Sequence, residues 1–204
     1  MSPTTSRKND RKNRPLGARF RRALSYAARL HATQFRKGTT RPYLAHLLGV
    51  TSTVLTHGGD EDEAIAALLH DAVEDQGGKR RLREIRRKFG ERVAHIVEGC
   101  TDADTEPKPP WLERKKKYLE HLRDADSSTR LVSAADKLYN AREILSDLRT
   151  HRDSVWSRFK GGKEGTLWYY DEVAKILRAG GPSELVEELD RVVAELRSAA
   201  RERR

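Results

Sequence analysis

Apolar residues recur at helical spacing along most of the chain after residue 15. One stripe runs from Leu16 to His31, and a longer stripe of the same period covers 128–148. Segments with the strict alternation of a β-strand are absent from the pattern, and glycine and proline interrupt the stripes. The predicted helices are 16–31, 43–57, a helix from residue 61 to the glycine pair at 77–78, 80–89, 90–101, 111–124, 128–148, 164–179 and 183–199. The pattern therefore predicts an all-α bundle of about eight to ten helices.

The helix that begins at Glu61 is apolar on nearly every side, which is typical of a helix at the centre of a bundle. Asp60 precedes it as an expected N-cap, and Glu63 stands where a capping-box partner would lie. At its other end, just before Gly77-Gly78, the sequence ALLHDAVED changes abruptly from apolar to charged. Such an end on a central helix would bring charge towards the core, which is costly unless the charge is paired.

Composition fits one domain with a modest core. Of the 204 residues, 36% are hydrophobic and 35% are charged. The single cysteine, Cys100, permits no intrachain disulfide and favours a reducing compartment. The longest apolar run, around 64–69, is too short for a membrane span, and no apolar stretch follows the basic start as in a secretory signal. We expect a cytoplasmic protein with no membrane partner, a disordered basic tail over 1–15 and a single domain over 16–200.

The formal net charge of +10 is unevenly distributed. Residues 1–22 carry a net charge of +7 and residues 79–92 carry +6, so the rest of the chain is slightly acidic. One interpretation is a disordered tail and a solvated helix face. The other is contact with nucleic acid or another polyanion. Because 79–92 follows directly after the charged turn, it could flank the mouth of a site there.

The charged turn brings together one imidazole and three carboxylates. Residues four apart lie over one another on a helix, so Glu74 is expected beside His70 and Asp75 beside Asp71. Burying these groups unpaired would be costly, and a bound cation would neutralise them. The alternative is a helix end that faces solvent, and an isolated His-Asp pair would not decide between the two.

Two other polar residues lie amid apolar neighbours on separate predicted helices. His46 occurs in YLAHLLG, and Asp136 occurs in LVSAADKLYN. Alone, the histidine could be a hydrogen-bonded core residue and the aspartate a structural cap. Together with His70 and Asp71 they make two imidazoles and two carboxylates. Such a mixed nitrogen and oxygen set suits Mn²⁺, Zn²⁺ or Fe²⁺ better than Ca²⁺.

The chain resembles the HD phosphohydrolase superfamily, and more closely the small alarmone hydrolases of the RelA/SpoT homologue family. The resemblance rests on FRKGTTRPYLAH, AALLHDAVED, VEGCTD and ADKLYNAREI, in that order, and it covers about residues 18–180. The combination of HDxxED with a later DKLxN is narrower than HD alone. It implies an all-α HD-domain hydrolase that binds Mn²⁺ and removes the 3′-pyrophosphate from guanosine tetra- or pentaphosphate (ppGpp, pppGpp) or the adenosine analogues.

The resemblance also implies a role for individual residues. His46, His70, Asp71 and Asp136 would be metal ligands; Glu74 and Asp75 would position or deprotonate the attacking water; Arg36, Lys37 and Asn140 would contact the substrate. The loop after Lys37 departs from the family pattern, because Thr-Thr-Arg replaces a segment that is commonly acidic or glycine-rich. That departure leaves the selectivity for the base open.

A second segment, RFKGGKEGTLWYY, supplies further candidates for substrate binding. Its cations Arg158, Lys160 and Lys163 could meet phosphates, and Tyr169 or Tyr170 could line a pocket. The alternative is that these aromatic residues belong to the core.

Several functions remain open on the sequence. The same centre could act on an adenosine alarmone, on another nucleotide or on a pyrophosphate at an RNA (tRNA) 3′ end. The protein could also be an antitoxin that neutralises a toxic alarmone synthetase, either by binding it or by destroying its product. Zn²⁺ and Fe²⁺ remain alternatives to Mn²⁺, and the sequence does not specify the oligomeric state.

Overall fold

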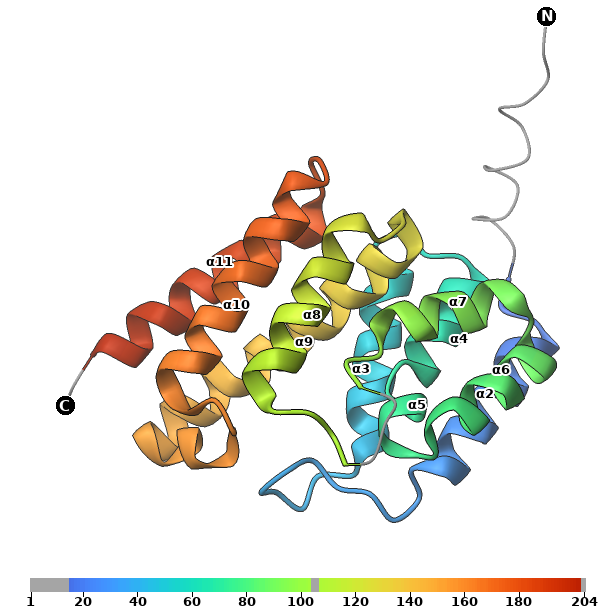
Figure 1. Ribbon diagram of the computed structural model, residues 1–204, viewed down its shortest axis with the longest axis horizontal. Coiled ribbons are helices and arrows are strands. Elements are labelled where there is room, and N and C mark those ends of the chain that lie inside the picture. Colours follow the sequence, from blue (N-terminus) through green and yellow to red (C-terminus); the bar gives the residue numbers. More distant parts are fainter. Residues whose placement is uncertain (1–14, 104–106, 203–204) are drawn as a thin grey trace, which may run out of the picture.

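The computed structural model describes residues 15–103 and 107–202, and these residues form an all-α fold (Figure 1). The helices are α2 (Ala18–Leu30), α3 (Tyr43–Thr56), α4 (Glu61–Leu69), α5 (Ala72–Asp75), α6 (Gly78–Phe89), α7 (Glu91–Cys100), α8 (Trp111–Asp124), α9 (Ser127–His151), the 3₁₀-helix η1 (Arg152–Arg158), α10 (Gly162–Ala179) and α11 (Glu184–Arg201). The only β-type pairing within these ranges is an isolated bridge between Phe35 and Pro42. The all-α prediction is confirmed, whereas the predicted tail lies almost entirely outside the described residues.

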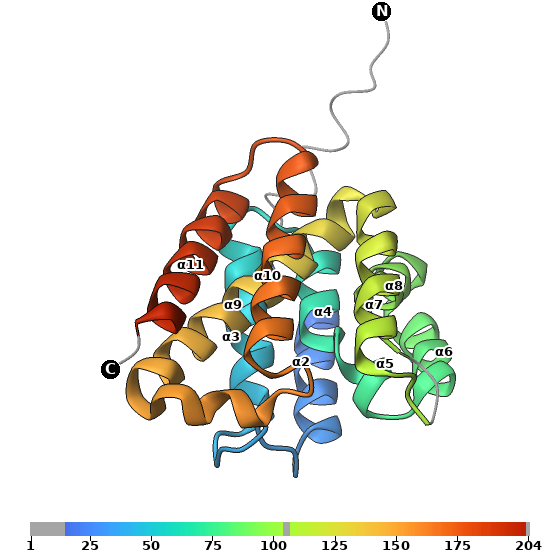
Figure 2. The ribbon, with the colours of Figure 1, turned by 60° about the vertical axis from the view of Figure 1, so that its left-hand side comes forward.

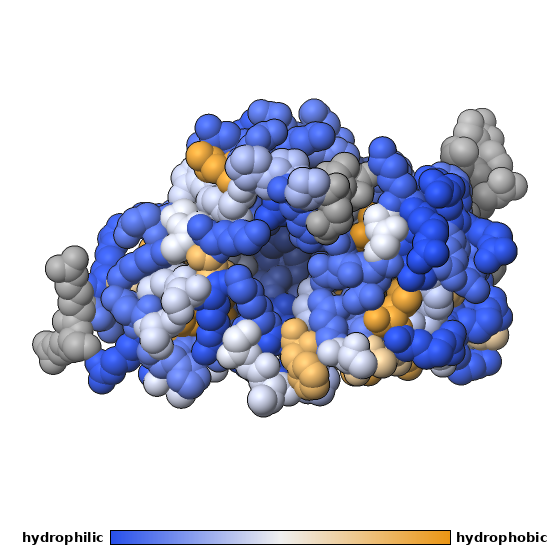
Figure 3. Space-filling view, turned by 60° about the horizontal axis from the view of Figure 1, so that its bottom comes forward, coloured by the Kyte–Doolittle hydropathy of each residue, from blue (hydrophilic) through white to orange (hydrophobic). Residues whose placement is uncertain are grey.

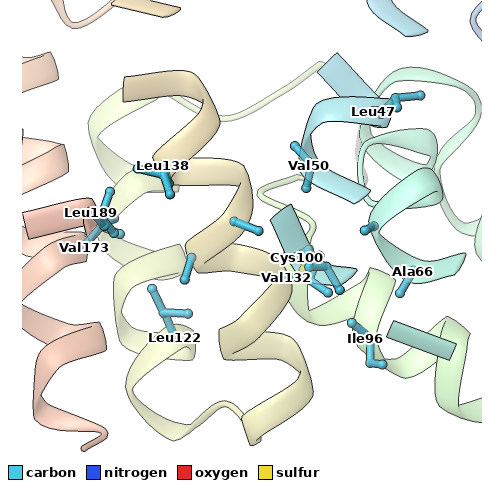
Figure 4. Packing of buried hydrophobic residues seen from close by; sticks show 14 of the residues in the cluster. Leu47, Val50, Ala66, Ile96, Cys100, Leu122, Val132, Leu138, Val173 and Leu189 are labelled. Carbon is cyan, nitrogen blue, oxygen red and sulfur yellow. The ribbon is translucent and has the colours of Figure 1, made fainter. Parts of the chain in front are cut away.

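Helix α9, with 25 residues, is the axis around which the other helices pack. It contacts α3, α4 and α7 on one side and α10, α11 and η1 on the other (Figures 1 and 2). Val132 and Leu138 of α9 are fully buried between these two groups (Figure 4). The helix begins one residue earlier than predicted, because the Asp126 carboxylate accepts a hydrogen bond of 2.8 Å from the Thr129 amide. The core therefore lies on both sides of a single helix.

Helix α4 is the most deeply buried helix of the fold, as predicted. Residues 64–69 have no exposed surface. The capping box is confirmed, since Asp60 accepts from the Glu63 amide and the Glu63 carboxylate accepts from the Asp60 amide. Arg92 of α7 donates to Asp60 at 2.7 Å and lies 3.3 Å from Glu63. This contact holds the start of α4 against α7.

The charged turn differs from the prediction of one continuous helix up to the glycine pair. Helix α4 ends at Leu69, and α5 starts at Ala72, so His70 and Asp71 occupy a break between them. Adjacent side chains on an unbroken helix diverge by about 100°. At the break the backbone departs only slightly from helical angles, with φ −58° and ψ −33° at His70 and φ −94° and ψ −4° at Asp71. The two side chains nevertheless meet, since Asp71 Oδ2 lies 3.0 Å from His70 Nε2.

Helix α8 has the bounds predicted for the helix 111–124 and is buried on one side. One side of it packs against α10, where Tyr118, Leu119 and Leu122 are buried. Arg114 is buried as well, because it pairs with Asp102. No helix in the described ranges is both long enough and apolar enough to cross a membrane.

Close contact between α3 and α9 depends on Gly49. A Cβ atom added at this position would lie 2.0 Å from the Tyr139 ring, which is far inside van der Waals contact. Gly49 stands three residues after His46, and Tyr139 stands three residues after Asp136. The glycine therefore brings two of the expected ligands together.

Candidate active site

Three buried side chains converge where α3, the α4–α5 break and α9 meet. His46, His70 and Asp136 are 1%, 2% and 6% exposed, and one donor atom from each lies within 4.8 Å of the others. The two Nε2 atoms of the histidines are 3.2 Å apart. The Oδ1 atom of Asp136 lies 3.4 Å from His46 Nε2 and 3.5 Å from His70 Nε2. This arrangement is a candidate metal centre.

Asp71 completes the group of four expected ligands. Its Oδ2 atom lies 3.0 Å from His70 Nε2 and 3.3 Å from His46 Nε2. The Tyr43 hydroxyl donates to the same oxygen at 2.6 Å. The structure thus brings His46, His70, Asp71 and Asp136 around one point, although they come from three separate segments of the chain.

A hydrogen bond on its second ring nitrogen fixes the orientation of His70. His70 Nδ1 donates to the carbonyl of Ala67 at 2.8 Å, which directs the Nε2 lone pair towards the other three ligands. Burial opposes a charge on this imidazole, but the carboxylates of Asp71 and Asp136 raise the pKa of His70 well above its ordinary value. Two imidazole acceptors and two carboxylates at this spacing repel one another unless a cation or a proton lies between them. The donor set fits a divalent transition metal.

Residues next to Asp136 on α9 hold its carboxylate in place. Lys137 Nζ lies 2.5 Å from Oδ2, and the Asn140 amide donates to Oδ1 at 2.5 Å. Although burial opposes ionisation, the ammonium of Lys137 and the imidazole of His70 lower the pKa of Asp136. Arg36, from the loop before α3, donates to the Asn140 oxygen at 2.5 Å. A continuous set of hydrogen bonds thus connects the loop to an expected metal ligand.

The acidic pair of α5 lies beside this centre. Lys108 Nζ is 3.1 Å from Glu74 Oε1, and the Gln34 amide donates to Asp75 Oδ2 at 2.8 Å. Burial raises the pKa of both carboxyl groups, and the negative charge of Asp71 raises them further. Such carboxylates can accept a proton more readily than ordinary ones do. Their roles in handling water stay a prediction.

A cleft of about 470 Å³ is lined by Glu74 of the acidic pair and by Tyr43, Lys137 and Asn140, which contact the expected ligands. A hollow with a mostly hydrophilic rim is visible on this side of the molecule (Figure 3). Its lining includes most of the predicted substrate residues: Arg36, Lys37, Asn140, Arg158, Lys160 and Tyr170. Tyr169 and Tyr170 line the cleft and are also part of the core, so the two interpretations of these aromatic residues hold together. The cleft has a size typical of ligand sites.

Lys163 and the basic segment 79–92 lie elsewhere. Lys163 is 3.5 Å from Asp153 and lines a separate hollow between α10 and α11. None of the residues 79–92 belongs to the described lining of the cleft. The expectation that this segment flanks the mouth of the site is therefore wrong, because α6 packs against α5 and α7 and carries its cations on another face.

The sequence interpretation missed several cations of the cleft. Lys108 enters it from the segment between α7 and α8, and Arg114 and Lys115 enter it from α8. Arg41 donates to both carboxylate oxygens of Asp147, at 2.7 and 2.8 Å, and Arg158 donates to the same carboxylate at 2.7 Å. Only Arg41 could have been suspected from the sequence, since it stands in the same short motif as Arg36.

Comparisons with known proteins agree with this geometry. A model of the HD domain family matches residues 23–167. A human protein described as guanosine-3′,5′-bis(diphosphate) 3′-pyrophosphohydrolase MESH1 is 42% identical over 174 residues, which cover 78% of this chain and 93% of the relative. The protein of the same description from Xenopus tropicalis is 42% identical over 125 residues, which cover 60% of this chain and 67% of the relative.

Solved structures give the same result. A structure described as a metazoan orthologue of SpoT that hydrolyses ppGpp superimposes with a TM-score of 0.71 at 26% identity, over 90% of this chain and 97% of that one. The protein lmo0812 from Listeria monocytogenes has a TM-score of 0.65 at 32% identity, over 72% of this chain and 96% of that one. The chain therefore belongs to the HD domain family, among the small alarmone hydrolases related to MESH1.

Proposed function

We propose that this protein is a metal-dependent hydrolase that removes the 3′-pyrophosphate from guanosine tetra- or pentaphosphate. The observation that carries the proposal is the group of two imidazoles and two carboxylates, of which His46, His70 and Asp136 are buried, beside a cleft rich in cations. The names of the relatives supply the substrate, because they describe hydrolases of guanosine-3′,5′-bis(diphosphate). The adenosine analogues remain within the proposal, since the loop that departs from the family pattern borders the cleft.

His46, His70, Asp71 and Asp136 would hold the metal, for which we propose Mn²⁺, with Zn²⁺ or Fe²⁺ as alternatives. When bound, such an ion polarises a phosphoryl oxygen and makes water more acidic. Tyr43, Lys137 and Asn140 stand between these ligands and the cleft and fix the two carboxylates. Their hydrogen bonds keep the donor atoms directed at one point before substrate binds.

Glu74 and Asp75 handle the water in this proposal. One of these carboxylates accepts the proton while the water oxygen attacks the phosphorus atom next to the 3′ oxygen. The bond between that phosphorus and the 3′ oxygen breaks, and the 3′ oxygen takes up a proton from the protonated carboxyl group or from solvent, so pyrophosphate leaves and a 3′-hydroxyl remains. Lys108 keeps the side chain of Glu74 in place, and the Gln34 amide does the same for Asp75.

The cations of the cleft bind the phosphates and the base. Arg36 lies 5.6 Å from the centre of the Tyr43 ring, so its guanidinium can stack on a purine as well as meet a phosphate. Arg41, Arg158 and Lys160 offer further positive charge in the same cleft. Arg41 and Arg158 share the Asp147 carboxylate, which substrate phosphates can replace because arginine forms bidentate contacts with both groups.

Release of pyrophosphate from a panel of substrates tests the proposal. We expect release from the guanosine alarmones with Mn²⁺, and loss of release in Asp71→Ala although that variant still folds. The panel also includes the adenosine analogues and an RNA with a 3′-pyrophosphate. If the folded protein binds Mn²⁺ but releases nothing from any alarmone, the proposal is wrong.

An antitoxin role would use the same chemistry, because hydrolysis destroys the product of a toxic alarmone synthetase. Co-expression with such a synthetase separates the two forms of this idea. Rescue by the parent but not by Asp71→Ala supports hydrolysis, whereas rescue by both supports binding of the synthetase. The RNA-end alternative lost its motivation, since the basic segment 79–92 does not line the cleft.

A further inference from the structure

The basic segment excluded from the cleft lies beside a second basic helix at the end of the molecule opposite α10 and α11 (Figure 1). Helix α6 packs next to α2, and exposed cations project from both. We call these cations the α2–α6 basic face, and they are Arg22, Arg29, Arg80, Arg83, Arg87 and Lys88. This end of the molecule is mostly covered by hydrophilic side chains (Figure 3). The proposed hydrolysis uses none of these residues.

A groove of about 530 Å³ runs between the two helices. Tyr26 and Phe89 contribute to its lining, and their ring centres are 5.6 Å apart. The guanidinium of Arg19 donates to the carbonyl of Phe89 at 2.6 Å, and Arg81 donates to the Tyr26 hydroxyl at 2.7 Å. These side-chain contacts hold α2 and α6 together, so the groove between them is part of the packed fold.

The charge on these helices is unusually one-sided. Helix α2 contains four arginines and no acidic residue, and α6 contains seven cations and a single acid, Glu84. The net charge of +10 on these 25 residues equals that of the whole chain. Glu84 already contacts Arg81 at 2.5 Å and Lys88 at 3.7 Å. Like charges at this density repel one another and destabilise the compact state.

Most cations of the face have no acidic partner among the described residues. Arg22, Arg29, Arg83 and Arg87 are exposed and form no ion pair within the described ranges. The cleft shows the opposite pattern, because Arg41 and Lys108 each contact a carboxylate there. The unpaired guanidinium groups are therefore available to an external anion.

We propose that the α2–α6 basic face binds the phosphate backbone of a nucleic acid. Arg80, Arg83 and Arg87 recur at a spacing of three and four on the outer side of α6, and Arg22 and Arg29 form a second row, two turns apart, on α2. A helix the length of α6 spans about 18 Å. Phosphates follow one another at about 3.4 Å along one strand of a duplex, so this helix covers about five of them. Arginine is the side chain best suited to bidentate contact with phosphate.

An anionic membrane fits this face less well. A peripheral helix binds a membrane through large apolar side chains next to its cations. The exposed large hydrophobic residues of the described chain are Phe35, Leu48 and Leu112, and none belongs to α2 or α6. The face offers cations without an apolar anchor, which is the pattern expected for a polar, charged backbone.

Nucleic acid bound here would not be the substrate. The residues that line the groove and those that line the catalytic cleft are different sets. No side chain of the basic face lies at the metal ligands, so the two activities can be separated by mutation. Contacts to phosphate alone carry no sequence information, and binding should therefore be independent of sequence.

The test measures fluorescence anisotropy of labelled RNA and DNA duplexes of about 20 base pairs with the full-length protein at increasing KCl concentration. Two double variants reverse charge on each helix separately, Arg83→Glu with Arg87→Glu and Arg22→Glu with Arg29→Glu. Lys116→Glu with Lys117→Glu on α8 is the matched control, since both lysines are exposed and the charge change is the same. We expect each face variant to weaken binding about tenfold or more. The slope of log K against log salt concentration should become shallower by the equivalent of about two phosphate contacts.

Hydrolase activity is measured on the same preparations and should be unchanged in the face variants. Activity without duplex binding in the parent would overturn the inference and leave the proposed function intact. Equal weakening by the control variant would also overturn it, because the effect would then be net charge alone. Binding only to vesicles of phosphatidylglycerol would identify a membrane surface instead. If a reversal variant does not fold, Arg83→Gln with Arg87→Gln replaces it, with a smaller loss expected.

Discussion

The candidate metal centre and the cleft are adjacent, yet they are built in different ways. His46 and Asp136 lie on long helices, are almost completely buried and are held by short hydrogen bonds or close packing. The cations of the cleft lie mostly on segments between helices, and several contact a carboxylate that a phosphate could replace. The first arrangement fixes donor atoms before substrate arrives. The second lets the protein exchange internal ion pairs for contacts with the substrate.

Replacing a ligand should have the largest effect. We expect Asp136→Ala to remove the bound metal and with it several kcal/mol of transition-state stabilisation, which corresponds to a loss in kcat of about a thousandfold or more. The measurements are metal content by elemental analysis and single-turnover kinetics. Lys160→Ala, in the cleft, is the matched control and should raise KM while metal content stays the same. Full activity in Asp136→Ala would disprove the ligand assignment.

Filling the space at Gly49 should disturb the packing of α3 against α9 beside the candidate metal centre, without removing any of its expected ligands. In Gly49→Ala the added methyl group meets the Tyr139 ring, so α3 must move away from α9. Overpacking of this kind costs about 1–3 kcal/mol of unfolding free energy. Thermal unfolding measures the loss, and metal affinity should fall with it because His46 lies one turn away. Gly58→Ala separates the steric effect from the backbone effect. An added Cβ atom at Gly58 meets open space but is strained by the positive φ, whereas Gly49 has no positive φ and its added Cβ atom meets the ring. Unchanged metal affinity in a destabilised Gly49→Ala would show that the ligands tolerate movement of α3.

Neutralising a carboxylate of the cleft should improve substrate binding, in contrast to the two preceding changes, which impair metal binding. Asp147→Asn frees Arg41 and Arg158 from their common partner, so these arginines become more available to substrate phosphates. We expect KM to fall by a few fold, while the unfolding free energy changes by less than about 1 kcal/mol, as for other partly exposed ion pairs. Steady-state kinetics and chemical denaturation measure the two quantities. A large rise in KM would instead mean that Asp147 orients the arginines.

The smallest effect concerns pH. Burial and the charge of Asp71 raise the pKa of Glu74, and Lys108 lowers it. In Lys108→Met the lowering contribution is lost, so the pKa of Glu74 rises further and the base becomes protonated at a higher pH. The acidic limb of the kcat profile should therefore move to higher pH by about one unit. Lys160→Met, which removes a cleft cation that forms no ion pair with Glu74 in the described structure, should leave the limb in place. An unmoved limb in Lys108→Met would assign the proton transfer to another group.

The sequence predicted the rigid region better than the cleft, for a physical reason. A polar residue such as His46 or Asp136 stands out when its helical neighbours are apolar, and helical periodicity then places it on the buried face. The break after Leu69 was missed because nothing in ALLHDAVED interrupts a helix by itself. Tertiary contacts act on this turn, including the hydrogen bond from the Tyr43 hydroxyl to Asp71. Local propensity does not contain such contacts.

The cleft was harder to predict because its residues lie on irregular segments. Lys108 reaches Glu74 across 34 positions of the chain, and no periodicity relates the two. Lys160 and Lys163 look equivalent in the sequence, but the helix that starts at Gly162 carries Lys163 to a different hollow. A run of cations in the sequence also does not show which face of the molecule they occupy. The segment 79–92 was therefore expected beside the cleft, although α6 carries its cations on another face.

The hydrogen bonds from Arg36 through Asn140 to Asp136 have a consequence for regulation by supply of metal. A nucleotide that draws Arg36 away changes the partner of Asn140, and through it the electron density on a metal ligand. Metal and nucleotide affinities are then linked, and each must change the other by the same factor. The affinity of the enzyme for its metal would therefore change with alarmone concentration, rising if the coupling is positive and falling if it is negative. Titrating metal with and without a non-hydrolysable nucleotide gives the sign of that cooperativity.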